Sequence, residues 1–304
     1  MSEFVNKRSR KIKLSTDDKI FYATVNIVLT LVLIIVAYPL IYIVSASFSE
    51  RSAILSGQVW LYPVGFSLEG YGEIFKNQNI WTGYGNSLLY TVFGTFLNVF
   101  FTMVCAYPLS KRGLPYKNQI MFLFTFTMFF NGGMIPNYML MKNIGLINTR
   151  WVMIIPGLIS VYNMIIARTF ISNSIPYELW EAAQVDGCSN TRYFFQMLLP
   201  LSKAVIAVLA LYYAIGHWNA YFNAMLYLSD RSMYPLQLFL REILISNTLS
   251  EASGMDPEML AAKQGLADLL KYCLIIVATV PVLIVYPFVQ KYFATGVMLG
   301  SVKG

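Results

Sequence analysis

Six long apolar stretches constrain the fold of this chain more than any other feature of its sequence. They lie at Ile20–Phe48, Gly83–Leu109, Gln119–Met141, Trp151–Ala167, Val205–Leu228 and Tyr272–Gln290. A helix crosses a hydrocarbon core about 30 Å thick with roughly 17 to 25 apolar residues, and each stretch is long enough. None has the apolar–polar alternation of an outer-membrane barrel strand. We therefore predict an all-α, multi-pass membrane protein with six transmembrane helices.

Composition favours a membrane protein over two soluble domains. Of the 304 residues, 57% are hydrophobic and 12% are charged, which is far from the balance of soluble globular chains. The first apolar stretch follows a basic N-terminus, is longer than a signal-peptide core and lacks a small-residue cleavage site. We interpret it as a retained span. Three cysteines, Cys105, Cys188 and Cys273, form no disulfide framework or metal-binding pattern.

The basic residues are distributed unevenly between the two sides of the predicted membrane. With both termini in the cytoplasm, the inner segments hold 14 of the 22 Lys and Arg residues and six of the 15 Asp and Glu residues. Such an excess of inner basic residues is the usual determinant of orientation. The net charge of +7 is therefore explained by orientation and by contact with membrane lipid, and we expect no nucleic-acid partner.

A polar stretch interrupts the apolar pattern between the fourth and fifth spans. Residues 181–200 read EAAQVDGCSNTRYFFQMLLP. Pro176 suits the first turn of a helix over Ile175–Val185, and Gly187 suits the left-handed residue that follows it. A second helical stretch is expected over Asn190–Leu198. On the first helix we expect a polar face and an apolar face, made respectively by Glu178, Glu181 and Gln184 and by Leu179, Trp180, Ala182 and Ala183.

Two interpretations of this helix remain open on its residues alone. It can rest on the inner leaflet as an interfacial helix, or it can dock on a soluble partner. A surface helix usually carries Lys and Arg on its polar face, whereas this one carries Glu178 and Glu181. An anionic leaflet repels such a face, so the charges favour a protein partner.

The same stretch resembles the EAA loop of permease subunits of type I ATP-driven (ABC) importers. The family pattern is EAA, three residues, Gly, nine residues, Ile, one residue and Leu-Pro, with Met197 here in place of the isoleucine. The segments NGGMIPNYMLMKNIGLINTRWVMIIPG, WNAYF and YFATGVMLGSVKG are also similar to carbohydrate-importer permeases, most of all the LplC- or YtcP-like branch for oligosaccharides and polysaccharide fragments. The matching loop residues are Glu181, Ala182, Ala183, Gly187, Leu199 and Pro200.

The resemblance implies a MetI-like transmembrane domain in a prokaryotic cytoplasmic membrane, with both termini cytoplasmic. It implies a basic tail at 1–19, a first helix and outer loop at 20–82, a type I core at 83–290 with the coupling loop at 175–200, and a cytoplasmic tail at 291–304. Glu181 would anchor the loop helix in an ATPase subunit, Gly187 would permit its turn, and the tail with Gly296, Gly300 and Lys303 would reach toward the ATPases. The implied coupling set is Glu181, Ala182, Ala183, Asp186, Gly187, Leu199 and Pro200.

The resemblance also implies the partners. These are a second homologous permease subunit, two ATP-binding subunits, an extracytoplasmic solute-binding protein and a carbohydrate substrate. The chain has no Walker-type Gly-Lys-Ser/Thr loop, so ATP and Mg²⁺ are expected on the ATPase subunits, and no cofactor, metal or catalytic residue is expected here. We therefore predict a transport subunit and not an enzyme.

An ion-coupled secondary carrier, or a channel for a small polar solute, is the alternative class. Such carriers usually place ionisable groups within the bilayer, but the six predicted spans contain no Asp, Glu, Lys or Arg, and His217 is the only histidine. This pattern favours an energy source outside the membrane.

Polar and aromatic residues in the spans mark a possible carbohydrate path. They suit sugar recognition, but membrane helices also use such side chains to hydrogen-bond one another, and both readings stay open. Similarly, the glycines and proline of FFNGGMIPNY (129–138) indicate either a kink lining a path or close helix packing. The candidate path residues are Asn131, Tyr212, Tyr213, Trp218, Asn219, Tyr221 and Asn223.

Overall fold

The computed structural model describes residues 15–249 and 257–298, and within them every regular element is helical. The predicted all-α fold is confirmed. The helices are α1 (Thr16–Ser47), α2 (Arg51–Leu55), α3 (Glu69–Lys76), α4 (Gln78–Ser110), α5 (Lys117–Phe129), α6 (Met134–Asn143), η1 (Arg150–Met153), η2 (Ile155–Gly157), α7 (Val161–Ser174), α8 (Tyr177–Val185), α9 (Asn190–Tyr193), η3 (Phe194–Leu198), α10 (Leu199–Leu201), α11 (Lys203–Trp218), α12 (Phe222–Tyr227), η4 (Arg231–Met233), α13 (Leu236–Leu249) and α14 (Pro257–Met298).

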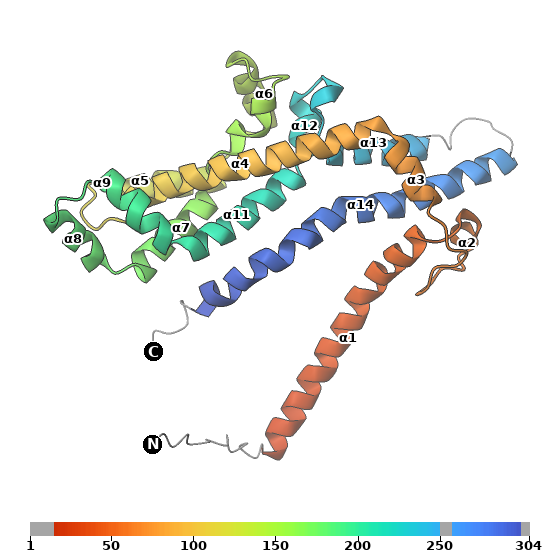
Figure 1. The fold of residues 1–304 in the computed structure, drawn as a ribbon, viewed down its shortest axis with the longest axis horizontal. Coiled ribbons are helices and arrows are strands. Elements are labelled where there is room, and N and C mark those ends of the chain that lie inside the picture. The colour runs from red at the N-terminus through yellow and green to blue at the C-terminus, as the bar shows by residue number, and fades with distance from the viewer. Residues whose placement is uncertain (1–14, 250–256, 299–304) are drawn as a thin grey trace, which may run out of the picture.

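Three of the predicted spans are long helices. In α1, α4 and α14 the segments long and apolar enough to cross a membrane are Thr16–Ser47, Gln78–Ser110 and Gly265–Pro287. α4 and α14 run along the length of the molecule, with α1 diverging from α14 below them (Figure 1). α14 continues without a break through Met298, past the predicted start of the tail at 291, while Gly300 and Lys303 lie outside the described residues.

The other three predicted spans are not single straight helices. The third and fourth are broken within their predicted ranges, and the break in the third agrees with the kink that is one of the two interpretations of 129–138. The fifth is preceded by a bend, and it is interrupted after Trp218, where α11 ends before α12 begins. α5 and α6 meet at 112°, the η1–η2 segment and α7 at 52°, and the α9–α10 segment and α11 at 81°. In the first case, Gly133 has φ +88°, which lies outside helical geometry and ends the run that the apolar pattern suggested. If each bent pair counts as one span, the described residues supply six.

α4 is the centre of the bundle, because it packs against α7, α11 and α13. Gly94 lets α11 approach closely: a Cβ atom at Gly94 would lie 2.5 Å from His217 Nε2. His217 Nε2 is also 2.8 Å from Asn98 Oδ1, and the Asn98 amide donates to the carbonyl oxygens of Gly157 and Leu158 at 2.6 and 3.0 Å. His217 is thus a packed polar residue.

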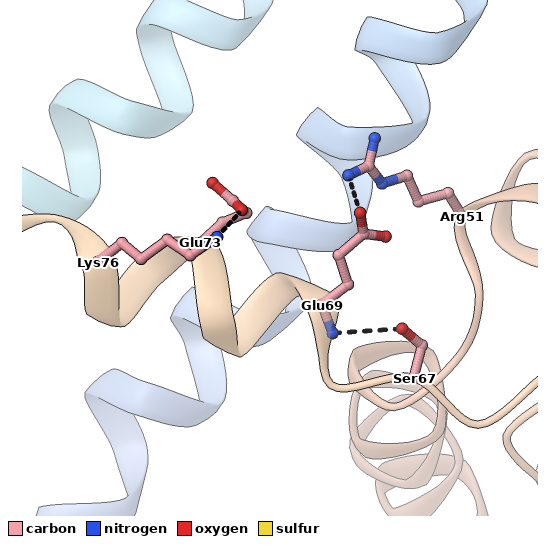
Figure 2. A network of polar contacts seen from close by, with 5 residues as sticks. All are labelled: Arg51, Ser67, Glu69, Glu73 and Lys76. Carbon is pink, nitrogen blue, oxygen red and sulfur yellow. Dashed lines mark hydrogen bonds and ion pairs between the residues drawn. The ribbon is translucent and has the colours of Figure 1, made fainter.

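The segment between α1 and α4 packs against the first part of α14. It contains α2 and α3, and Figure 2 shows polar contacts within it. Arg51 pairs with Glu69, and Lys76 Nζ lies 2.7 Å from Glu73 Oε1. This end of the molecule, with α2, α3 and α13, lies opposite the end that carries α8 and α9 (Figure 1).

Candidate coupling site

The loop helix α8 forms where the sequence predicts it. It starts at Tyr177, two residues later than expected, because Ile175 precedes Pro176 and is extended, as is Pro176 itself. Glu178 lies in the first turn, where a carboxylate stabilises the positive end of the helix.

A Schellman motif ends α8. The Cys188 N–H donates to the Ala183 carbonyl at 2.8 Å, and the Gly187 N–H donates to the Gln184 carbonyl at 3.0 Å. Gly187 has φ +70°, the left-handed conformation that this motif requires. The predicted role of Gly187 as the residue that turns the chain after the helix is confirmed.

The two faces of α8 differ in part from the prediction. Ala183 is buried, and Trp180 is partly buried against the same cluster of spanning helices. Glu178, Glu181 and Gln184 are exposed, as expected. Leu179 and Ala182, assigned to the apolar side, are exposed instead, and Val185 is 88% exposed. The outward face of α8 therefore combines two carboxylates with apolar side chains.

The second half of the motif lies on a deformed helix. Ser189 caps α9, since its Oγ accepts the Arg192 N–H at 3.2 Å. The chain then passes through the π-helical turn η3 into α10, and a π-turn inside a helix often marks a functional position. Among the seven predicted coupling residues, Ala183 is buried and Leu199 is half-buried; the exposed ones are Glu181, Ala182, Asp186, Gly187 and Pro200.

A lysine surrounded by aromatic rings joins α8 to α4. Lys111 follows α4 directly, and its Nζ lies 4.0 Å from the centre of the Trp180 ring, 4.5 Å from that of Tyr107 and 4.9 Å from that of Tyr193. Such cation–π contacts are strongest where the cation is partly desolvated. Burial lowers the pKa of Lys111 to about 8.

Asn190 adds a second link between the same helices. Its Oδ1 accepts the Tyr107 hydroxyl at 3.2 Å and the Trp180 indole N–H at 3.4 Å. These contacts were not predicted from the sequence. The available signal was a lysine directly after one apolar stretch and an aromatic residue on each helix of the loop.

Several predicted path residues are exposed, one of them between α5 and α6 and the others on α11 or just after it. Asn131 lies between α5 and α6, where its Oδ1 accepts the Gly133 N–H at 2.8 Å. After α11 ends, the chain carries three more exposed candidates, and Tyr212 is exposed on α11 itself. The three residues after α11 are Asn219, Tyr221 and Asn223.

Tyr213 and Trp218 occupy different positions, inside the bundle. The Tyr213 hydroxyl is 2.7 Å from Thr102 Oγ1 and accepts the Ser160 N–H at 3.0 Å. The Trp218 indole donates to the Ala278 carbonyl of α14 at 3.0 Å. Both side chains are buried, so their visible interactions are those that hold helices together.

A second feature that the sequence analysis missed is a cavity between α4, α11 and α14. Its volume is about 470 Å³, and nearly all of its lining is apolar, including one edge of Trp218. The exceptions are Thr91 and Thr95, whose hydroxyl groups are buried without a hydrogen-bond partner. These two hydroxyl groups lie one helical turn apart on α4.

No group of three or more His, Cys, Asp or Glu side chains suited to a metal ion occurs among the residues that the structure describes. The coupling loop thus stands out for its surface and its attachments, and not for a reactive centre.

Comparison with known proteins decides the family. The family model described as "Binding-protein-dependent transport system inner membrane component" matches residues 13–299, which is nearly the whole chain. The chain belongs to this family. A binding-protein-dependent permease is a membrane-embedded transport subunit and not an enzyme, and it works with ATPase subunits, a solute-binding protein and a second permease.

Relatives from Bacillus subtilis (strain 168) match this permease over most of their length. It is 40% identical to "Protein LplC" over 267 residues, covering 88% of this chain and 89% of that protein. It is 41% identical over 274 residues to "Polygalacturonan/rhamnogalacturonan transport system permease protein YtcP", covering 89% of this chain and 94% of the relative.

A solved structure matches the fold of this permease as well. It is titled "Crystal structure of a bacterial ABC transporter involved in the import of the acidic polysaccharide alginate", and the match has a TM-score of 0.82 at 33% sequence identity. The match covers 92% of this chain and 99% of that one. The family therefore favours the ATP-driven interpretation over an ion-coupled carrier or a channel.

Proposed function

We propose that this permease translocates a carbohydrate, either an oligosaccharide or a polysaccharide fragment, across the cytoplasmic membrane. The substrate class is supported by the similarity to a polygalacturonan/rhamnogalacturonan permease and to an alginate importer. The working assembly would contain this chain, a second homologous permease, two ATPase subunits that bind ATP and Mg²⁺, and an extracytoplasmic solute-binding protein.

The observation that carries the coupling role is that α8 is attached to the bundle on one side and exposed on the other. Its inner side is held by Ala183, Trp180 and the Lys111 contacts. Its outer side presents Glu178, Glu181 and Val185 to the surroundings. A short helix that is fixed to the bundle on one side and exposes a mixed apolar and acidic surface on the other suits docking into a soluble subunit.

In this proposal, nucleotide-driven movement of the ATPases displaces α8 and changes which side of the membrane the pathway faces. Moving such a two-state equilibrium from 1:99 to 99:1 requires a difference of about 5.5 kcal/mol in binding between the two states. The side chains that we propose to test for sugar contact are the exposed candidates Asn131, Tyr212, Asn219, Tyr221 and Asn223.

Charge reversal on α8 tests the coupling role. We expect Glu181→Lys in the reconstituted complex to abolish ATP-dependent sugar uptake while the complex remains inserted in the membrane, because the reversed charge opposes docking. Uptake into vesicles and ATP hydrolysis are measured together. Asp17→Lys is the matched control, since Asp17 is an exposed acidic residue at the start of α1, far from the loop.

A change in the backbone conformation of the turn after α8 also tests the coupling role. Gly187→Pro removes the N–H that donates to Gln184 and cannot adopt the positive φ of this position, so we expect the same uncoupling. Gly216→Ala is its control, because a Cβ atom at Gly216 in α11 meets nothing within 4 Å. If both Glu181→Lys and Gly187→Pro transport normally, α8 is not the coupling element.

A further inference from the structure

A cationic cavity lies directly against the coupling helix. Its volume is about 220 Å³, and its walls come from the end of α4, the segment between α4 and α5, the start of α5, the second half of α7, the first half of α8 and the segment formed by α9 and η3. The basic side chains that line it are Lys111, Arg112, Lys117 and Arg168.

Among the residues that the structure describes, no carboxylate pairs with any of these four cations. The ion pairs among the described residues are Arg51–Glu69, Lys76–Glu73 and Arg231–Glu242, and none of them involves a cavity residue. Two of these pairs appear in Figure 2, at the opposite end of the molecule. At that end Arg51 and Lys76 each pair with a carboxylate. The basic side chains of the cavity have no such partner among the described residues.

The backbone and the aromatic rings hold the cations in place and leave donors free. Lys117 Nζ donates to the Lys111 carbonyl at 2.9 Å, and Arg168 Nε donates to the Leu109 carbonyl at 3.0 Å. The Arg112 guanidinium lies 4.7 Å from the centre of the Tyr177 ring. A lysine has three N–H donors and an arginine five, so each of these side chains keeps N–H groups for a ligand.

We propose that this cavity binds a phosphate group and that the bound phosphate bridges α4, α7 and α8. Converging Lys and Arg donors match the tetrahedral, multiply charged oxygens of phosphate. The volume exceeds that of a water molecule several times over (about 30 Å³ in the liquid). The location rests on the proposed function, which places α8 on the cytoplasmic side, where inner-leaflet phosphates are within reach of basic pockets between helices.

The phosphate has two possible sources, a lipid headgroup or a soluble phosphate compound. In either case the ligand touches both the spanning helices and the coupling helix, through Lys111 and its neighbour Trp180. Occupancy would then hold α8 against the bundle. Partial desolvation lowers the pKa of the Lys111 amine, and the charge of an anion in the cavity offsets this effect because it favours the protonated amine.

The test is a binding measurement on the purified complex, without sugar or nucleotide, so that its failure is separate from failure of the transport proposal. Native mass spectrometry counts the lipids retained from vesicles of phosphatidylcholine and phosphatidylglycerol, and calorimetry measures binding of inorganic phosphate. We expect preferential binding of a phosphate-bearing anion. The double variant Lys117→Gln/Arg168→Gln should weaken it about tenfold or more.

Two matched variants separate charge from folding. Arg168→Lys keeps the positive charge and should retain most of the binding. Arg192→Gln removes an exposed arginine on α9, outside the cavity, and should bind as the wild type does. Melting of each variant complex shows whether it is folded.

The outcomes are distinct. Retained phosphatidylglycerol that inorganic phosphate does not displace identifies a lipid source, and direct binding of inorganic phosphate identifies a soluble one; both support the proposal. Equal retention of the two lipids with no phosphate binding overturns it. So does equal weakening by Arg192→Gln. Labelling of Lys117 with an amine reagent supplies one more test. If Lys117 is protected only when the ATPase is bound, the proposal is overturned in favour of an acidic side chain of that subunit.

Discussion

Lys111 illustrates how a single residue can connect the membrane-spanning part of this permease to its coupling helix. It follows α4, yet the ring nearest to its amine belongs to Trp180 on α8. Movement of α8 therefore changes the surroundings of a charge that is attached to α4. A partly buried charge held by rings and not by a carboxylate keeps the two helices together while allowing the contact to adjust.

The protonation of Lys111 predicts a pH effect on stability. Burial lowers the pKa of its amine from 10.5 to about 8 in the folded chain. Between these values the unfolded chain still holds a proton that the folded chain has released, so the free energy of unfolding rises with pH. We expect the difference in melting temperature, wild type minus Lys111→Met, to increase as the pH rises from about 8 toward 10.5. A constant difference would contradict the assignment.

Proline in α14 shows how neighbouring helices compensate for a local defect. Pro281 has no N–H, so the carbonyl of Val277, four residues earlier, loses its helical partner. The Tyr84 hydroxyl of α4 donates to this carbonyl at 2.6 Å. The next carbonyl, Ala278, accepts the Trp218 indole of α11 at 3.0 Å. Three helices thus meet at a position where a membrane helix needs outside donors.

A double-mutant cycle tests this compensation. Tyr84→Phe keeps the ring and removes the donor, so we expect a loss of about 0.5–1.5 kcal/mol in the free energy of unfolding. In a Pro281→Ala background the restored N–H satisfies Val277, and the same substitution should cost little. The cycle is measured by unfolding in detergent, and equal costs in both backgrounds would refute the compensation.

At the scale of the whole molecule, the chain exposes a large apolar surface that other molecules must cover. None of the most apolar window of α1 is buried against the rest of the chain, and its exposed side chains include Leu33 and Ile35. Lipid can cover such a surface, and so can the second permease that this family employs.

This arrangement predicts which assemblies transport. Vesicles that contain this chain and the second permease without ATPase subunits should show no sugar uptake above protein-free vesicles, even with a proton gradient. Addition of the ATPases, the binding protein and ATP should restore it. Uptake driven by the proton gradient alone would instead indicate an ion-coupled carrier.

Much of the fold follows from one-dimensional patterns. The apolar stretches predicted the spanning segments because burial in lipid depends on local hydrophobicity. The helix over 177–185 and its end at Gly187 were predictable because capping and left-handed turns are decided within a few residues. The break before α7 was not, since apolar composition does not distinguish a straight helix from a broken one. The glycines and proline of 129–138 left a kink before α6 as one of two interpretations.

The contacts between distant segments depended on the tertiary structure alone. The sequence supplies a lysine after one span and aromatic residues in the loop, but it does not show that Lys111 contacts Trp180. Nor does it show that the Tyr84 hydroxyl donates to the Val277 carbonyl, 193 residues away, which Pro281 leaves without a helical partner. The convergence of four cations on one cavity is likewise visible only in the tertiary structure. Local patterns specify which segments enter the membrane and where the coupling helix begins and ends. Packing decides which face of that helix turns outward, because each face's environment is set by side chains that come from elsewhere in the chain.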